Sequence, residues 1–230
     1  MLGKEEKNSE GQAGFRPNRS CVDHLYTLGK KISQGRNDAG LTTYCFFLDV
    51  QKAYDTEWGN GLWKKSSEAG IRAKMWRMVK KMTECAKRAM MLDGEISKYF
   101  DILQGAAQGC TLSPTLFKIF IDGLIIAIEG AKQGVKVGQD MVSGLMFADD
   151  VVGISDTSEG LQNQIEKALE YTRKWRVTAN ASKCAVLACH EDKKNPVEFK
   201  WKWGEEELPM VDHYTYLGVE ISKTVLGMHT

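Results

Sequence analysis

The sequence predicts an α+β protein in which an antiparallel sheet carries helices on one face. Three observations lead to this fold class. The run TYCFFLDV at 43–50 is rich in aromatic and β-branched residues, which is typical of a buried strand. Two later segments, around 93–94 and 149–150, have the composition of hairpins. Between these strands the apolar residues follow helical spacing, and that alternation favours antiparallel neighbours with helices packed over them.

The first half of the chain is expected to begin with a disordered, polar stretch at 1–13, because MLGKEEKNSEGQ has no apolar core. Residues 14–42 predict a turn followed by a helix. After the buried strand, the segment at about 60–90 has an apolar stripe at helical spacing and a basic opposite face. AMMLDGEISKYF then predicts a hairpin that turns at Asp93-Gly94.

The second half of the chain continues this alternation. An almost wholly apolar helix is expected from Pro114 onward, and its composition indicates burial. The segment VSGLMFADDVVGIS predicts a second hairpin with two aspartates at its tip, and an amphipathic helix is expected at about 161–175. Three or four short strands are expected over 183–221: CAVLACH, VEFKWKW, ELPMV and YTYLGVEIS.

The overall composition excludes several classes of protein. The chain has 230 residues, 43% of them hydrophobic, which excludes a wholly disordered chain, a collagen and a coiled coil. None of the six cysteines forms a Cys-x-x-Cys pair, which disfavours a zinc ribbon. The sequence shows neither a signal peptide nor an apolar stretch long enough to span a bilayer, which predicts a soluble intracellular protein without membrane contacts. The formal net charge is +1, but nine Lys/Arg against two Asp/Glu between 60 and 90 predict one basic face.

Three acidic residues stand out because apolar strand residues surround them. Asp49 lies at the end of the first strand, and Asp149 and Asp150 lie at the tip of the second hairpin. An Asp-Asp pair in a hairpin is often only a solvated turn. If the two strands are neighbours, however, three carboxylates meet at one edge and repel one another unless cations bind there. Mg²⁺ takes such oxygen ligands, and two ions about 3.5–4 Å apart can clamp the attacking and leaving oxygens of a phosphoryl displacement.

Several segments, in order along the chain, resemble the reverse transcriptases of non-LTR (LINE-type) retrotransposons. These segments are GFRPNRSCVDHLYTL, FLDVQKAYDT, QGCTLSPTLFKIFIDGL, FADD, ANASKCAVL and YLGVEIS. The resemblance runs from about residue 12 to 223, and 100 residues separate Asp49 from Asp149. All of these segments in the family's order form a highly specific signal.

The resemblance implies a polymerase palm with partial fingers and no thumb. Residues 14–42 correspond to the partial fingers segment and 43–223 to the palm, which includes a fingers-like helical insertion at about 60–103. Residues 224–230 are expected to form a tail. Little chain precedes GFRPNRS or follows YLGVEIS, so we expect the missing fingers and thumb segments to belong to a longer polyprotein.

The resemblance also implies an RNA-directed DNA polymerase that uses an RNA template, a DNA primer and dNTPs. Asp49, Asp149 and Asp150 match the metal-binding aspartates of the family, and the carbonyl of Val50 is implied as a further ligand. The implied cofactors are two Mg²⁺ ions, with Mn²⁺ as an alternative. Lys183 matches a lysine that acts near the departing pyrophosphate, as a general acid; an exposed lysine without a role is the alternative.

Five further residues are candidates for contacts with nucleotides or nucleic acid. Tyr54 matches an aromatic gate that leaves no room for a ribose 2′-hydroxyl and so selects deoxynucleotides. Gln108 and Gly109 match a loop under the templating pair, where glycine allows close approach of the backbone. Arg16 and Arg19 lie in the fingers segment and are candidates to contact the template backbone, although a solvated loop explains them nearly as well.

Two functional hypotheses stay open at this point. The chain is either part of an active polymerase or a catalytically silent remnant that at most binds nucleic acid. A group II intron-type reverse transcriptase or maturase shares much of the same pattern. A viral RNA-dependent RNA polymerase is disfavoured by Tyr54 and by Phe147-Ala148, where that class has a glycine before its aspartates. Target-site insertion implies nuclear action, with a cytoplasmic ribonucleoprotein as the alternative.

Overall fold

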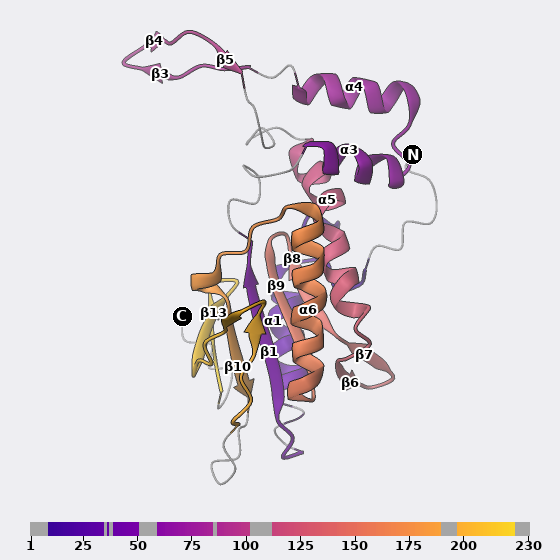
Figure 1. Ribbon diagram of the computed structural model, residues 1–230, viewed down its shortest axis with the longest axis vertical. Helices are drawn as coiled ribbons and strands as arrows, with labels where there is room; N and C mark the ends of the chain where they lie inside the picture. Colours follow the sequence, from indigo (N-terminus) through magenta and orange to yellow (C-terminus); the bar gives the residue numbers. More distant parts are fainter. Residues whose placement is uncertain are drawn as a thin grey trace.

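The computed structural model describes residues 9–34, 36, 39–50, 59–84, 87–101, 112–189 and 197–223. Its centre is a four-stranded sheet in the order β10-β1-β9-β8, in which every neighbouring pair is antiparallel (Figure 1). The strands are β1 (Thr43–Asp49), β8 (Gly144–Phe147), β9 (Asp150–Ser155) and β10 (Ala185–Cys189). The predicted α+β fold with an antiparallel sheet is therefore confirmed.

Strand β1 lies inside the sheet between β9 and β10. The side chains of Cys45, Phe46, Phe47 and Leu48 are all at most 2% exposed. Because consecutive side chains of a strand point to opposite faces, a run that is buried at every position needs a cover on both sides of the sheet.

Two long helices, α5 (Ser113–Glu129) and α6 (Ser158–Trp175), provide the cover on one face (Figure 1). Phe46 belongs to the same hydrophobic cluster as the apolar sides of both helices. Helix α6 begins where the hydroxyl of Thr157 accepts a hydrogen bond from the Gly160 N–H (3.1 Å), and it ends at Arg176, which adopts a left-handed conformation.

Shorter elements cover the opposite face. They are α1 (Cys21–Tyr26), the π-helix η1 (Thr27–Gln34) that continues it, and the hairpin of β13 (His213–Tyr216) and β14 (Val219–Ser222). Phe47 packs in one cluster with Leu28 and Ile32 from the helical segment and with Ile221 from the hairpin. The segment predicted as partial fingers therefore completes the burial of β1, together with the end of the described chain.

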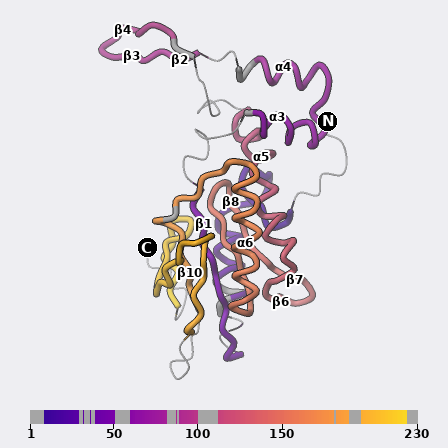
Figure 2. The backbone as a smooth tube through the Cα atoms, in the orientation of Figure 1, coloured from indigo at the N-terminus to yellow at the C-terminus, as the bar shows by residue number. Residues whose placement is uncertain are grey.

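A separate group of elements projects beyond the end of the sheet at which β1 ends (Figures 1 and 2). Helices α3 (Gly59–Glu68) and α4 (Ala73–Glu84) are followed by one hairpin. Near its turn β3 (Met91–Leu92) pairs with β4 (Glu95–Ile96), and near its base β2 (Lys87–Arg88) pairs with β5 (Phe100–Asp101). The predicted turn at Asp93-Gly94 is confirmed, and both residues have positive φ (51° and 85°).

The remaining short elements lie between and after these. They are β6 (Val135–Val137), β7 (Asp140–Val142), the 3-10 turn η2 (Ala181–Lys183), β11 (Lys202–Trp203) and β12 (Glu206–Glu207). The segment YTYLGVEIS is a hairpin and not a single strand, because Leu217 and Gly218 adopt positive φ (50° and 78°) and reverse the chain. Among the described helices, none combines the length and the apolar character that a membrane crossing needs.

Residues 9–13 correct the prediction of a disordered start. The Met146 N–H of β8 donates to the Gly11 carbonyl (2.7 Å), and the Ala13 N–H donates to the Met146 carbonyl (2.9 Å). Gln12 and Ala13 are 0% and 2% exposed. The prediction was wrong here because a polar segment can still be buried when the edge of a sheet offers partners to its backbone.

Candidate active site

The two segments that carry the predicted acids are neighbours in the sheet, although 100 residues separate them in sequence. Asp49, the last residue of β1, pairs with Asp150, the first residue of β9. Phe147 of β8 also pairs with Asp150, so Ala148 and Asp149 form the tight turn between β8 and β9. The antiparallel register therefore brings the three predicted carboxylates to one end of the sheet.

Burial and like charge act together on Asp149 and Asp150. Burial raises the pKa of Asp149, and the charge of Asp49 raises it further, while a backbone hydrogen bond acts in the opposite direction. Burial also raises the pKa of Asp150; the charges of Asp149 and Asp49 add to this effect, and that of Lys183 opposes it. The carboxylates are thus close enough to affect one another, and positive charge placed between them would be stabilising.

Lys183 supplies part of that positive charge. Its Nζ lies 3.6 Å from Oδ1 of Asp49, with the lysine side chain 63% exposed and the aspartate 26% exposed. The loop before Lys183 is attached to the end of β1, since the Asn180 N–H donates to the Asp49 carbonyl (2.8 Å) and Val50 forms a bridge with Ala179. Two of the residues that the resemblance assigns to catalysis, Asp49 and Lys183, are therefore brought together by β1 and η2.

Tyr214 is a further residue at this site, which the sequence did not indicate. Its ring stacks on Phe47 of β1, with centroids 4.1 Å apart and an interplanar angle of 9°. Its hydroxyl donates a hydrogen bond to the Lys183 carbonyl (2.9 Å). Burial, and then the charges of Asp49, Cys184 and Asp150, raise the pKa of Tyr214 to about 12. The only sequence signal was its place in a predicted strand, which says nothing of a contact 31 residues away.

The fingers arginines make contacts within their own segment. Nη1 of Arg16 donates to the carbonyls of Ser9 (3.0 Å) and Gln12 (3.1 Å), and Nη2 forms an ion pair with Glu10 (3.5 Å). Arg19 forms an ion pair with the same glutamate. Neither contacts the three carboxylates in these interactions, and their contact with a template stays a prediction.

Three predicted residues, Tyr54, Gln108 and Gly109, lie outside the described residues. Their proposed contacts with the nucleotide therefore stay predictions from the sequence.

The site fits divalent cations by the type of its residues and by their backbone positions. In the part of the chain that the structure describes, no group of three His, Cys, Asp or Glu side chains is already arranged to hold a metal ion. The strand register nevertheless brings Asp49, Asp149 and Asp150 to one edge, and carboxylate oxygens are the ligands that Mg²⁺ takes in proteins. The donors are present without forming a ready-made cluster.

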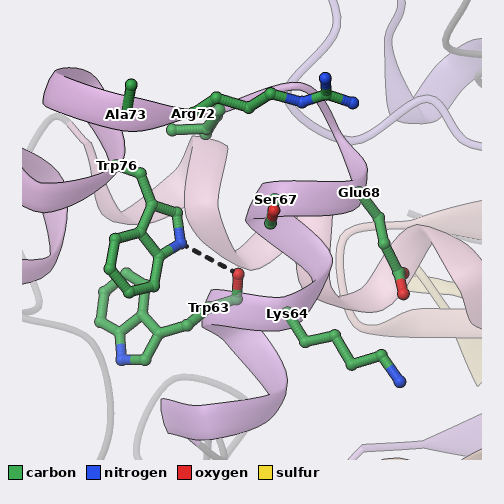
Figure 3. Close-up of a pocket in the computed structure, with 8 residues that line it drawn as sticks. Trp63, Lys64, Ser67, Glu68, Arg72, Ala73 and Trp76 are labelled. Carbon is green, nitrogen blue, oxygen red and sulfur yellow. Dashed lines mark hydrogen bonds between the residues drawn. The ribbon is translucent and has the colours of Figure 1, made fainter.

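A pocket of about 440 Å³ lies between α3 and α4, away from these acids (Figure 3). Trp63 and Trp76 lie at one side of it, where the Trp76 indole N–H donates to the Trp63 carbonyl (3.2 Å). Lys64 and Arg72 also line the pocket, which fits the predicted basic face.

Comparison with known proteins connects this site to one family. Residues 1–221 match a family model described as reverse transcriptase (RNA-dependent DNA polymerase). A Pol polyprotein from the type-2 retrotransposable element R2DM of Drosophila melanogaster is 27% identical over 220 residues, which cover 93% of this chain and 21% of the relative. The RNA-directed DNA polymerase from the mobile element jockey of Drosophila funebris is 27% identical over 180 residues, covering 76% of this chain and 19% of the relative.

Solved structures agree on the fold. Telomerase from Candida tropicalis in complex with a TWJ fragment of telomeric RNA matches with a TM-score of 0.65 and 14% identity, over 98% of this chain and 35% of the telomerase chain. The same telomerase truncated from its C-terminal domain matches with a TM-score of 0.61 and 14% identity, over 94% and 40%. The chain spans about a fifth of the length of the curated relatives named above. Since the family model matches nearly the whole chain, the protein belongs to the reverse transcriptase family, and its relatives are the enzymes of non-LTR retrotransposons.

Proposed function

We propose that this chain carries the catalytic centre of an RNA-directed DNA polymerase, which adds a dNTP to the 3′-hydroxyl of a DNA primer on an RNA template. The observation that carries this proposal is the pairing of Asp49 with Asp150, next to Asp149 in the adjoining turn. Reverse transcriptases use divalent metal ions. We propose two Mg²⁺ ions here, replaceable by Mn²⁺, held by the three aspartates and the Val50 carbonyl.

In the proposed reaction the primer 3′-hydroxyl loses its proton to water and its oxygen forms a bond to the α-phosphorus of the dNTP, while the bond from that phosphorus to pyrophosphate breaks. When bound, the metal ions supply charge neutralisation at the attacking and leaving oxygens. The aspartates fix the place at which that charge is held, so most of the catalytic gain comes from positioning and electrostatics. Lys183, an exposed cation next to Asp49, is suited to donate a proton to the departing pyrophosphate.

Three residues that the sequence assigns to nucleotide binding complete the proposal. Tyr54 selects deoxynucleotides by occupying the space of a ribose 2′-hydroxyl. Gln108 and Gly109 form the loop under the templating pair.

Primer extension on poly(rA)/oligo(dT) with Mg²⁺ tests the proposal. We expect the wild-type chain to extend the primer, and Asp149→Asn to lower the rate about 100-fold or more, because it removes a negative charge that helps hold the cations. The matched control is Asp140→Asn, which makes the same change at an exposed residue of β7 and leaves the rate unchanged.

Two results would contradict the proposal. In the first, the wild-type chain binds the template and primer but does not extend the primer, which would favour the alternative hypothesis of a catalytically silent remnant. Extension that persists in Asp149→Asn would show that this acid is not part of the catalytic centre.

A further inference from the structure

The first described residues lie along the edge of β8 that no other strand of the sheet covers. Gln12 pairs with Met146 in a parallel bridge, and the hydrogen bonds of Met146 with Gly11 and Ala13 flank it. The segment then approaches the turn between β8 and β9 closely, since a Cβ at Gly14 would lie 2.2 Å from the Ala148 nitrogen. Only glycine fits at this distance.

The side chain of Gln12 is completely buried and joins three parts of the molecule. Its Oε1 accepts hydrogen bonds from the N–H of Gly14 (2.7 Å) and of Ala148 (3.3 Å). Its Nε2 donates to Oδ1 of Asp122 in α5 (3.3 Å), and Oδ2 of Asp122 accepts from Lys118 (2.7 Å). The amide therefore connects the edge segment, helix α5 and the turn that carries the candidate catalytic acids.

Ala148 has the conformation that this connection restrains. Its φ is 59°, in the left-handed region that costs a residue with a Cβ free energy. Ala148 directly precedes Asp149, so its backbone angles determine how Asp149 leaves the turn. A hydrogen bond to the N–H of Ala148 from a fully buried acceptor stabilises that conformation.

We propose that Gln12 is a positioning residue, which holds the turn at Ala148 so that Asp149 stays next to the paired Asp49 and Asp150. Its effect on catalysis rests on the proposed polymerase function, whereas its effect on the turn does not. Without the Gln12 acceptor, Ala148 leaves the left-handed conformation more often, and the carboxylates are held together for a smaller fraction of the time.

The test compares Gln12→Met with Gln164→Met in the full chain. Gln164 is also 0% exposed, and its Nε2 donates to the carbonyls of Ser143 (3.0 Å) and Ile154 (2.9 Å), at the other end of the β8–β9 hairpin. Both variants thus remove a buried glutamine amide of equal size. Only Gln12→Met removes an acceptor for the turn.

The first measurement is amide hydrogen exchange by NMR. We expect Gln12→Met to speed exchange at the Ala148 amide about tenfold relative to the Val152 amide within β9, and Gln164→Met to leave that ratio within twofold of wild type.

A second variant tests directly whether Oε1 of residue 12 is the acceptor that protects Ala148. Gln12→Glu keeps the acceptor Oε1, but its other carboxylate oxygen replaces Nε2 and faces the carboxylate of Asp122. Adding Asp122→Asn supplies a donor for that oxygen. The double variant should therefore return the ratio of Ala148 to Val152 exchange to within threefold of wild type.

The second measurement is primer extension by the same proteins. We expect Gln12→Met to lower kcat about tenfold with the KM for dTTP unchanged, and the double variant to recover most of kcat. Gln164→Met should keep at least half of the wild-type kcat at a temperature where both variants are folded.

Three outcomes overturn the proposal: unchanged exchange at Ala148 in Gln12→Met, equal acceleration in Gln164→Met, or faster exchange with an unchanged kcat. If Gln12→Met does not fold, the double variant Gln12→Glu/Asp122→Asn tests the proposal instead. Fast exchange at the Ala148 amide in that double variant would contradict the proposed role of Gln12. If the wild-type chain extends no primer, the proposed function fails, while the exchange measurement still decides whether Gln12 holds the turn.

Discussion

The central sheet and the projecting unit, which consists of α3, α4 and the hairpin of β2 to β5, bury their large apolar side chains to very different degrees. Phe46 in β1 is 0% exposed, whereas Met91 and Leu92 in the β3–β4 hairpin are 75% and 76% exposed. Both regions contain large apolar side chains in regular secondary structure. An apolar side chain stabilises a fold only where a second layer removes it from water, and the sheet has layers on both faces.

The two regions also differ in how exactly their candidate functional residues must be placed. The candidate catalytic acids are placed by strand register, which cannot shift by one residue without moving every buried side chain to the other face. Helices α3 and α4 offer charge on their exposed sides, which requires less exact placement. We therefore expect stability to depend mainly on the sheet, and salt-sensitive binding of nucleic acid to depend mainly on the helices.

The largest expected effect on stability comes from the middle of the sheet. Phe46→Ala should lower the free energy of unfolding by about 3–5 kcal/mol, because it leaves a cavity in a packed core. Met91→Ala should change it by less than about 0.5 kcal/mol, since that side chain is already in water. Urea unfolding of both variants measures the contrast. Similar losses in the two variants would show that the projecting hairpin is part of the stabilising core.

The second prediction concerns a buried histidine that packs against Phe147, next to the turn between β8 and β9. His24 of α1 is 5% exposed, its Nδ1 is buried without a hydrogen-bond partner, and its ring packs edge-on against Phe147 at 6.3 Å. Burial lowers the pKa of His24 from 6.5 to about 4; Arg19 lowers it too, and Asp23 acts in the opposite direction. Below pH 6.5 the unfolded chain therefore takes up a proton at this residue that the folded protein does not.

The direction in which stability changes with pH follows from that difference in proton uptake. The contribution of neutral His24 to stability is complete above pH 6.5 and decreases as the pH falls toward 4, by about 2 kcal/mol between pH 7.5 and pH 5. Urea unfolding at these two pH values should show that loss in the wild type and in His213→Gln, which changes an exposed histidine, but not in His24→Phe. An equal loss in His24→Phe would assign the pH dependence to other groups.

The smallest expected effect on stability comes from the basic side of α4. Lys74 and Arg77 are exposed, and the double variant Lys74→Gln/Arg77→Gln should unfold within about 0.5 kcal/mol of the wild type. If both residues contact phosphates of single-stranded RNA, the slope of log affinity against log salt should become shallower by about 1.4.

Fluorescence anisotropy with a labelled oligonucleotide at several salt concentrations measures that slope. The control is Lys132→Gln/Lys136→Gln, which makes the same change in charge at exposed residues near β6, at the opposite end of the molecule (Figure 1). An equal change of slope in both double variants would mean that binding depends on total charge and not on α4.

The sequence predicted the elements whose signals are local. The strand at β1, the turn at Asp93-Gly94 and the helix at α6 depend on residue types within a few positions of one another. The three aspartates were also found, because apolar strand residues flank them and because their motifs resemble a family.

Contacts between distant segments were not predictable in this way. The burial of Gln12 depends on the edge of β8, more than 130 residues away, and a polar residue in a polar segment gave no sign of it. The bond of Tyr214 to the Lys183 carbonyl goes with the packing of the Tyr214 ring of β13 on Phe47 of β1. Such contacts depend on which surfaces pack together in the folded protein, and a local sequence pattern does not predict this.

The sequence by itself determined the family of this protein, its α+β class and the identity of its candidate catalytic acids, because each of these depends on which residues occur and in what order. Only the tertiary structure decided that Asp49 stands opposite Asp150, that Lys183 lies beside Asp49, and that Gln12 supports the turn before Asp149. The physical reason is that hydrogen bonds and charges act over a few ångströms. The pairing of β1 with β9, in a sheet buried between two layers, brings residues 100 positions apart within that range.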